Sequence, residues 1–190
     1  MKTKKLIPLA LCIAAGFGIV TARQKQQEIQ APVMPTDPNT KLVTYAAVDE
    51  VKNTGKNELF KRASGWFNTY YKNPTEVIRE KDTVALKIVG KPRFRIYSPP
   101  NEKGVKMDAG IVQYTITVAV KEGKYKYEIT EINWKQQSYY PIEKWIEQKD
   151  KYKSNNYYLY QTDSIITNDV IKNLQHAMRT APKVIDKDNW

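Results

Sequence analysis

The feature that most constrains the fold is a stretch of strict alternation between Gly110 and Lys121. Every second side chain there is apolar, and most positions between them carry amide or hydroxyl groups. The two sets are Val112, Tyr114, Ile116, Val118 and Val120 against Gln113, Thr115 and Thr117. A period of two residues is that of a β-strand with one buried and one solvated face. The chain is therefore expected to contain a sheet that is covered on one side only.

The residues that follow predict the partner of this strand. Glu122-Gly123 is a hairpin signal, and Lys124 to Trp134 form the expected returning strand. Its apolar side chains Tyr125, Tyr127 and Ile129 again fall on one face. An antiparallel hairpin is thus the centre of the predicted fold.

Helices are expected on either side of the strands. Asn57 can cap a helix that ends at Asn73-Pro74. A second helix is expected between about Asp163 and Arg179. Both carry apolar side chains at three- and four-residue spacing: Leu59, Phe60, Ala63, Trp66, Phe67 and Tyr70 in the first, and Ile166, Val170, Ile171, Leu174, Ala177 and Met178 in the second.

Three more strands complete the predicted order. They lie at 42–51, at 76–81 and, after a turn at Asp82-Thr83, at 84–97, where Gly90 and Pro92 indicate a bulge or bend. The order strand, helix, four strands, helix (β-α-β-β-β-β-α) predicts an α+β fold. We expect a two-layer sandwich in which both helices cover one face of an antiparallel sheet.

The strand at 84–97 also predicts a basic open face. Its even positions are apolar (Val84, Leu86, Ile88, Phe94 and Ile96), and its odd positions include the candidate ligand-binding residues Lys87, Lys91, Arg93, Arg95 and Tyr97. Side chains two residues apart project to the same side, so an acidic ligand could lie along this basic strip. The alternative is a solvated face, or an edge strand protected by charge from pairing with other chains.

A second candidate lies in the Tyr-rich connection at 135–161. Exposed aromatic rings stack on sugar rings or on partner side chains. The cluster comprises Trp134, Tyr139, Tyr140, Trp145, Tyr152, Tyr157, Tyr158 and Tyr160, of which Tyr139, Tyr140, Trp145, Tyr157 and Tyr158 are the candidate ligand-binding residues. The alternative is that residues 157–160 form a short strand or flap over the hydrophobic layer.

The amino-terminal segment has the pattern of a secretory signal peptide. Three lysines precede an apolar run from Leu6 to Val20, and small residues follow, so cleavage is expected after Ala22. The run is shorter than the ~20 residues of a spanning helix, which disfavours a retained anchor. Cys12 lies in mid-run after Leu11, which argues against a lipoprotein. We predict an exported protein, periplasmic, envelope-bound or secreted, with no permanent membrane span.

The predicted organisation is a signal peptide at 1–22, a Gln- and Pro-rich exposed spacer at 23–41, a domain at 42–181 and a tail at 182–190. The whole chain of 190 residues has a formal charge of +11. Removal of the signal peptide leaves 28 basic and 20 acidic residues, a net charge of +8, and no cysteine. The domain must then be held together by its core.

Few catalytic groups are available. With one cysteine and one histidine, His176, the chain offers no disulfide framework, Cys/His metal site or Cys-His dyad, and we expect no metal or cofactor. No Gly-rich phosphate loop or nucleophile elbow is present. Carboxylate pairs such as Asp49 and Glu50, or Glu128 and Glu131, are the remaining means of hydrolysis, although adjacent strand residues such as Asp49 and Glu50 diverge.

The chain resembles a known family. The resemblance rests on the signal peptide, the Pro-rich spacer, Gly55-Lys56-Asn57-Glu58-Leu59-Phe60 with Trp66-Phe67, and Gly123-Lys124-Tyr125-Lys126-Tyr127. These segments are similar to the domain-of-unknown-function family 4468, which has a TBP-like fold, over about residues 40–134. The resemblance implies an exported protein of Bacteroides-type bacteria with helices on the convex face of a curved sheet. It implies no activity and carries over no catalytic residue.

These observations favour a non-catalytic envelope protein that binds through its open sheet face or its aromatic segment. The partner would be an anionic glycan, a lipid head group or another envelope protein. Export separates the chain from the nucleoid, so nucleic acid is not expected despite the positive charge. A carboxylate-dependent hydrolase and a structural or inhibitory protein partner are the alternatives.

Overall fold

The architecture is described from a computed structural model, for residues 29–135, 138–147 and 155–180. The predicted signal peptide, the tail at 182–190 and Tyr152 lie outside these ranges. Among the described residues, no helix combines the length and the apolarity that are needed to cross a bilayer.

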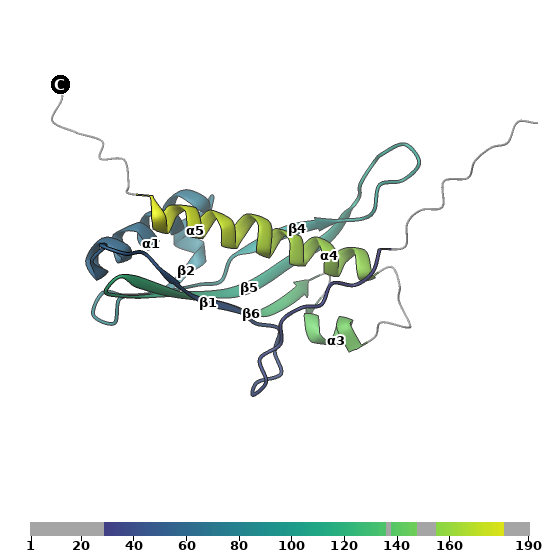
Figure 1. The fold of residues 1–190 in the computed structure, drawn as a ribbon. Coiled ribbons are helices and arrows are strands. Elements are labelled where there is room, and N and C mark those ends of the chain that lie inside the picture. Colours follow the sequence, from purple (N-terminus) through teal and green to yellow (C-terminus); the bar gives the residue numbers. More distant parts are fainter. Residues whose placement is uncertain (1–28, 136–137, 148–154, 181–190) are drawn as a thin grey trace, which may run out of the picture.

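The strands form one antiparallel sheet in the order β1-β6-β5-β3-β2, with β4 also paired to β5 and β7 to β6 (Figure 1). Their bounds are Tyr45–Glu50 (β1), Ile78–Asp82 (β2), Lys87–Gly90 (β3), Arg93–Tyr97 (β4), Asp108–Lys121 (β5), Lys124–Lys135 (β6) and Tyr139–Pro141 (β7). The predicted bend at Gly90 and Pro92 is confirmed, because the expected strand at 84–97 is divided there into β3 and β4.

Helices cover one face of this sheet. They are α1 (Lys56–Tyr70), α2 (Pro74–Val77), α3 (Ile142–Glu147), α4 (Asn155–Ile165), the π-helical turn η1 (Ile166–Ile171) and α5 (Lys172–Arg179). The last three follow one another as a single rod across the strands (Figure 1). The predicted α+β class and the two-layer arrangement are confirmed: α1 contacts β5 and α5, and α4 contacts β4.

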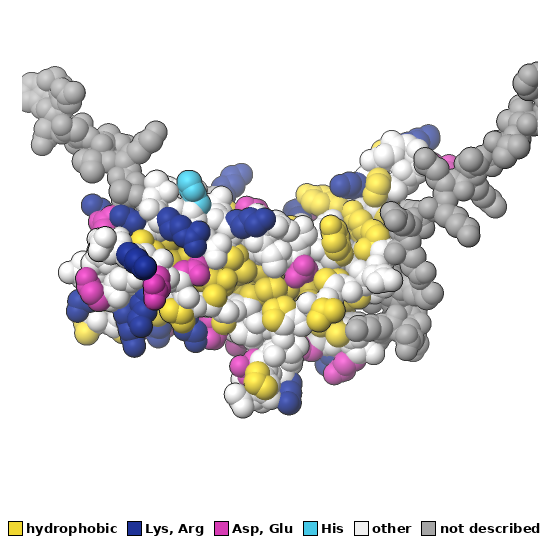
Figure 2. Space-filling view, in the orientation of Figure 1, with side chains coloured by type: hydrophobic (Ala, Val, Ile, Leu, Met, Phe, Trp, Pro, Cys, Tyr) yellow, Lys and Arg dark blue, Asp and Glu magenta, His cyan; other side chains and the backbone are white. Residues whose placement is uncertain are grey.

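The core lies between the two layers. Alternate residues of β5 and β6 supply it from the sheet, and Leu59, Ala63, Trp66 and Phe67 supply it from α1. The predicted stripe of the last helix is buried at Ile166, Val170, Ile171, Leu174 and Met178. Away from the core, the hairpin between β4 and β5 projects from the body, and apolar side chains are exposed near its base (Figure 2). The exposed hydrophobic residues of this hairpin are Tyr97, Val105 and Met107.

A bulge in β6 sets which side chains face the core. Gln113 pairs with Asn133 but Thr115 pairs with Thr130, so β6 has one extra residue, and Glu131 there has a φ of 50°. A single inserted residue reverses the alternation beyond it. Ile129 before the bulge and Ile132 after it are therefore both buried.

Two local predictions are wrong. Asn57 does not cap α1: Gly55 occupies the N-cap position, and the backbone N–H of Lys56 donates to Oε2 of Glu122 at 3.1 Å. Val84 does not belong to the core face, because it is 93% exposed. The carboxylate of Asp82 accepts hydrogen bonds from the N–H groups of Val84 and Ala85, which turns the chain before β3 begins.

The connection at 135–161 is more regular than predicted. It contains β7, α3 and the start of α4, and residues 157–160 lie in α4 instead of in a strand or flap. Leu159 extends the buried stripe of the last helix toward its N-terminus. The prediction of an exposed spacer is also wrong at Met34, which is 7% exposed and belongs to the core.

Close packing between the layers requires Gly90. A Cβ atom at this position would lie 2.8 Å from Cε1 of the buried Phe67. Gly90→Ala should therefore lower the free energy of unfolding by about 1–3 kcal/mol through overpacking, measured by urea denaturation. Gly65→Ala is the matched control: with no atom within 4 Å, it should stabilise α1 by about 0.5–1 kcal/mol. Equal effects of the two substitutions would contradict this packing.

Buried tyrosines tie the two layers together. The hydroxyl of Tyr45 donates to Oδ1 of Asp163 at 2.7 Å, and that of Tyr125 donates to Oδ2 of Asp49 at 2.8 Å. Asp49 also accepts a hydrogen bond from Nε2 of Gln175 at 2.9 Å. The phenol pKa is raised at several positions. The main cause is the loss of hydration on burial, and nearby carboxylates or phenols add to it. The largest effects are at Tyr45, Tyr70, Tyr71, Tyr114 and Tyr125.

These raised pKa values predict alkaline instability. A phenol that is harder to ionise in the folded state makes its full contribution to the free energy of unfolding below its unfolded pKa of about 10. This contribution falls as the pH rises above that value. Tyr45→Phe should therefore make the decline less steep by about 0.7 kcal/mol per pH unit on average between pH 9 and pH 11, and by up to about 1.4 kcal/mol per pH unit above that range. Urea denaturation between about pH 9 and pH 11 measures the slope. A wild-type stability that does not fall over this range would contradict the prediction.

Candidate functional site

The sheet face away from the helices is open to solvent. The register places Arg93 opposite Gln113, Arg95 opposite Ile111, and Lys87 opposite Ala119, and the helix-facing residues alternate with these positions. Lys87, Arg93 and Arg95 of the predicted basic strip therefore lie on the open face. Lys91 lies there too, because its ion-pair partner Glu131 also accepts a hydrogen bond from the hydroxyl of Thr115 on that face.

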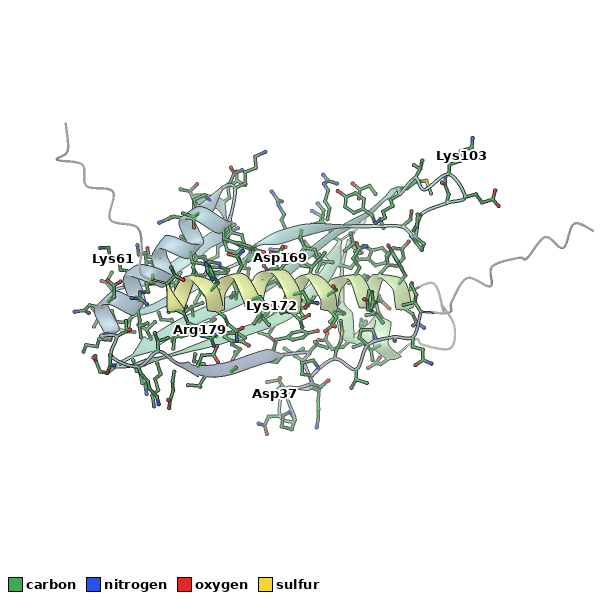
Figure 3. The ribbon with its side chains drawn as sticks, turned by 45° about the horizontal axis from the view of Figure 1, so that its top comes forward. Asp37, Lys61, Lys103, Asp169, Lys172 and Arg179 are labelled. Carbon is green, nitrogen blue, oxygen red and sulfur yellow. The ribbon has the colours of Figure 1, made fainter. Side chains whose placement is uncertain are left out.

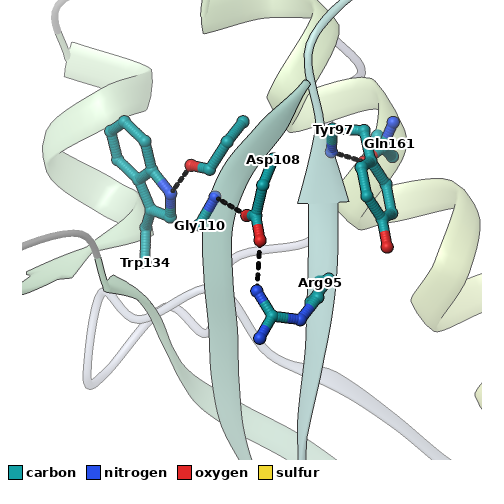
Figure 4. Close-up of polar contacts among 7 residues, drawn as sticks. Arg95, Tyr97, Asp108, Gly110, Trp134 and Gln161 are labelled. Atoms are coloured by element: carbon teal, nitrogen blue, oxygen red, sulfur yellow. Dashed lines mark hydrogen bonds and ion pairs between the residues drawn. The ribbon is translucent and has the colours of Figure 1, made fainter. Parts of the chain in front are cut away.

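Each cation of the basic strip has an acidic partner from another position in the fold. Lys87 pairs with Glu80 at 2.9 Å, and Lys91 pairs with Glu131 at 3.3 Å. Arg93 pairs with Glu76 at 3.7 Å, and Arg95 pairs with Asp108, which also accepts the N–H of Gly110 (Figure 4). The strip is thus locally neutralised. Its fifth residue, Tyr97, points its backbone N–H at Gln161 of α4 (Figure 4).

A groove opens where the strip is interrupted. Between β3 and β4 the chain leaves the hydrogen-bonded ladder with β5. The turn before α2, and α2 itself, lie beside this gap, where the backbone N–H of Lys91 donates to the carbonyl of Val77. Two pockets of about 370 and 230 Å³ adjoin there and share Lys91, Gln113 and Tyr139. The larger is further lined by Tyr71, Lys72, Asn73, Glu76, Val77, Arg79 and Arg93, and the smaller by Tyr114, Thr115, Glu131 and Asn133.

The groove retains positive charge that the strip lacks. Lys91 and Arg93 are paired with Glu131 and Glu76, but Lys72 and Arg79 form no ion pair within the described part of the chain. Glu131 remains a carboxylate near neutral pH, because the hydroxyl of Thr115, and then Lys91, lower its pKa. Two unpaired cations thus lie beside two neutralised pairs.

The central part of the chain matches a described family. Residues 45–135 match the model of a family that is described as "Domain of unknown function (DUF4468) with TBP-like fold". These residues belong to the DUF4468 family. The family recognised in the sequence is thereby confirmed, and so is its TBP-like fold.

Two solved structures share the fold. A DUF4468 family protein from Bacteroides ovatus is 17% identical, with a TM-score of 0.62 over 83% of this chain and 96% of the other. A TBP-like protein from Parabacteroides distasonis is 14% identical, with a TM-score of 0.55 over 78% of this chain and 99% of the other. None of the curated proteins matches the chain in sequence.

Most of the predicted aromatic segment packs against the DUF4468 domain. Trp145 is buried and contacts Trp134 edge-on at 4.3 Å, and Tyr158 stacks on Trp134 at 6.0 Å. Tyr157 is half-buried and contacts Tyr158 edge-on. Tyr140 is also partly buried, in register with Trp134. These four candidates lie in the packed part of the segment.

Tyr139 is the exception. It pairs with Lys135 in the ladder, faces the open side, is 53% exposed and lines both pockets of the groove. The ammonium group of Lys135 lies 5.0 Å from the centre of its ring. The fold therefore brings one residue of the aromatic segment together with Lys91 and Arg93 of the basic strip, although more than 40 residues separate them in sequence.

The remaining candidates are dispersed. Asp49 faces the helices and Glu50, one residue on, falls on the opposite face of β1. Glu128 pairs with Lys126 outside the groove. His176 is exposed on α5. Among the described residues, no group of His, Cys, Asp or Glu side chains could hold a metal ion.

Several groove residues were missed by sequence analysis. Lys72 and Asn73 lie after α1, Arg79 lies at the bulged end of β2, and Gln113 and Asn133 are polar positions of ordinary strands. No local motif marks them, because their proximity depends on the chain leaving the ladder between β3 and β4.

The geometry at Glu131 gives a direct test of the groove. Thr115→Val removes the hydrogen bond that lowers the pKa of Glu131 most, and Lys91→Met removes the neighbouring positive charge. Both variants should raise this pKa toward its ordinary value. NMR titration of the Glu131 side-chain carboxyl carbon measures it. No rise in either variant would mean that these groups do not meet in solution.

Proposed function

We propose that this DUF4468 domain is a non-catalytic binding domain of an exported protein, and that its groove holds an acidic saccharide. The observation that carries the proposal is that the half-exposed ring of Tyr139 lies in the same groove as Lys72 and Arg79, two cations without an ion-pair partner in the described part of the chain. Aromatic rings stack on the apolar faces of sugars, and cations attract their carboxylate or sulfate groups.

The other groove residues support a polar ligand. The amides of Gln113 and Asn133 and the hydroxyl of Thr115 offer hydrogen-bonding groups. A specific site needs a few such convergent groups around an apolar surface. A small inorganic anion would leave Tyr139 and these amides unused, whereas an acidic sugar would engage all of them.

The proposed absence of catalysis follows from the state of the carboxylates. Hydrolysis of a glycosidic bond needs one carboxylic acid with a raised pKa to protonate the leaving group. Glu131 has a lowered pKa, and Glu76 is paired with Arg93. The environment of Glu131 does not favour a proton donor near neutral pH.

Calorimetric titration with tri-galacturonate tests the proposal, with maltotriose as the neutral probe. We expect binding of the acidic trisaccharide alone, weakened by salt. Lys72→Ala with Arg79→Ala should weaken it about 10-fold, since each exposed charge contributes up to about 1 kcal/mol. Tyr139→Ala should weaken it about 5-fold through lost stacking.

The matched control removes two lysines away from the groove. Lys61 on α1 and Lys103 at the tip of the projecting hairpin lie at opposite ends of the molecule (Figure 3). Lys61→Ala with Lys103→Ala should change the affinity less than about 2-fold. If both double variants lost affinity equally, the interaction would depend on the net charge of the protein alone, which would contradict the proposal. Release of reducing ends that depends on Glu76 or Glu131 would show that the domain is an enzyme.

A further inference from the structure

A second hollow lies on the open face, away from the groove. It has a volume of about 290 Å³ and lies between the ends of β1, β5 and β6 and the turn before β3. Its main side-chain lining comes from Val48, Ala85, Ala119, Lys121, Lys124 and Lys126. The groove and the hollow share no residue.

The hollow results from one small residue in the sheet. The register places Val48, Lys126, Ala119 and Lys87 in one row across β1, β6, β5 and β3. Ala119 is the only alanine among the open-face positions of β5 from Gln113 to Lys121, and it stands between two long lysines. Its methyl group leaves a depression that the neighbouring side chains surround.

The floor and the rim of the hollow differ in chemistry. The floor carries the methyl groups of Ala85 and Ala119 beside Val48, which is 60% exposed. The rim carries three lysines. Lys126 pairs with Glu128 at 3.0 Å, whereas Lys121 and Lys124 form no ion pair within the described ranges. An apolar floor with an unpaired cationic rim complements a ligand that is both apolar and negatively charged.

We propose that this hollow binds a single-chain anionic amphiphile, with its acyl chain on the floor and its carboxylate at Lys121 and Lys124. A simple anion would leave the apolar floor exposed to water, and a neutral apolar molecule would leave the two ammonium groups unpartnered. The volume is at the lower end of the range for ligand pockets, which suits part of one chain. Lipids with two chains exceed it.

This site is independent of the acidic-saccharide groove. Gln113 in the groove and Ala119 in the hollow are separated along β5 by about 20 Å at ~3.3 Å per residue. Failure of either proposal therefore leaves the other unaffected.

The test uses NMR of the full-length mature chain with ¹³C-labelled alanine methyl groups and decanoate below its micelle concentration. Decanoate should shift the methyl resonances of Ala85 and Ala119 saturably and leave that of Ala63, which lies on the buried face of α1, unchanged. Decyltrimethylammonium, which has the same chain with a positive head, should bind at least about 5-fold more weakly because the rim repels it.

Two pairs of variants separate the floor from the rim. Ala119→Phe fills the hollow and should abolish the shift at Ala85, whereas Thr117→Phe places the same ring on the same face outside the hollow and should preserve it. Lys121→Ala with Lys124→Ala should weaken decanoate about 5-fold, against less than about 2-fold for Lys61→Ala with Lys103→Ala.

Three outcomes would overturn the proposal. They are equal binding of the anionic and cationic amphiphiles, unchanged decanoate binding by Ala119→Phe, and unchanged binding by the Lys121 and Lys124 double variant. If Ala119→Phe fails to fold, the lysine variants still decide the result. Anionic vesicles form the last arm: if they bind the protein while monomeric decanoate does not, the surface is a membrane contact and not an amphiphile site.

Discussion

β5 is the strand on which the sheet is assembled, because it pairs with β3 and β4 along one edge and with β6 along the other. Its alternation therefore fixes the two faces of the whole sheet. Val112, Tyr114, Ile116, Val118 and Val120 are all buried, and the helices can pack only against the side that they present. The polar residues between them become the floor of the open face.

Contacts between elements, and not the sequence of any one strand, determine which positive charges on that open face are neutralised. The four strip cations are matched by Glu80 of β2, Glu131 of β6, Glu76 of α2 and Asp108 of β5. Such exposed pairs add little stability, but they cancel the local field that a ligand would meet. Where the face is hollowed, Lys72 and Arg79 in the groove and Lys121 and Lys124 in the hollow have no ion-pair partner among the residues that the structure describes.

The sequence predicts what is periodic and local. The hairpin of β5 and β6, the aromatic face of α1 and the stripe from Ile166 to Met178 follow from residue spacing, and the fold class follows from their order. Predictions fail where a distant group intervenes, as when Glu122 binds the start of α1 in place of an Asn57 cap. The groove brings together residues that are more than 40 positions apart in the sequence. The sequence therefore identifies Lys91, Arg93 and Tyr139 separately, but it does not predict that they lie in one groove.

The extra residue at Glu131 shows how one position can govern both the interior and the surface. Beyond it, Trp134 turns to the core side, where its Nε1 donates to the carbonyl of Ala109 at 2.8 Å, and Asn133 turns toward the groove. Loss of a single residue at the bulge would exchange these two side chains, presenting an indole to solvent and an amide to the core. Over this part of the sheet, chain length is therefore as strong a constraint on evolution as residue identity: substitutions can be absorbed one at a time, but a one-residue deletion would change the packing and the surface together.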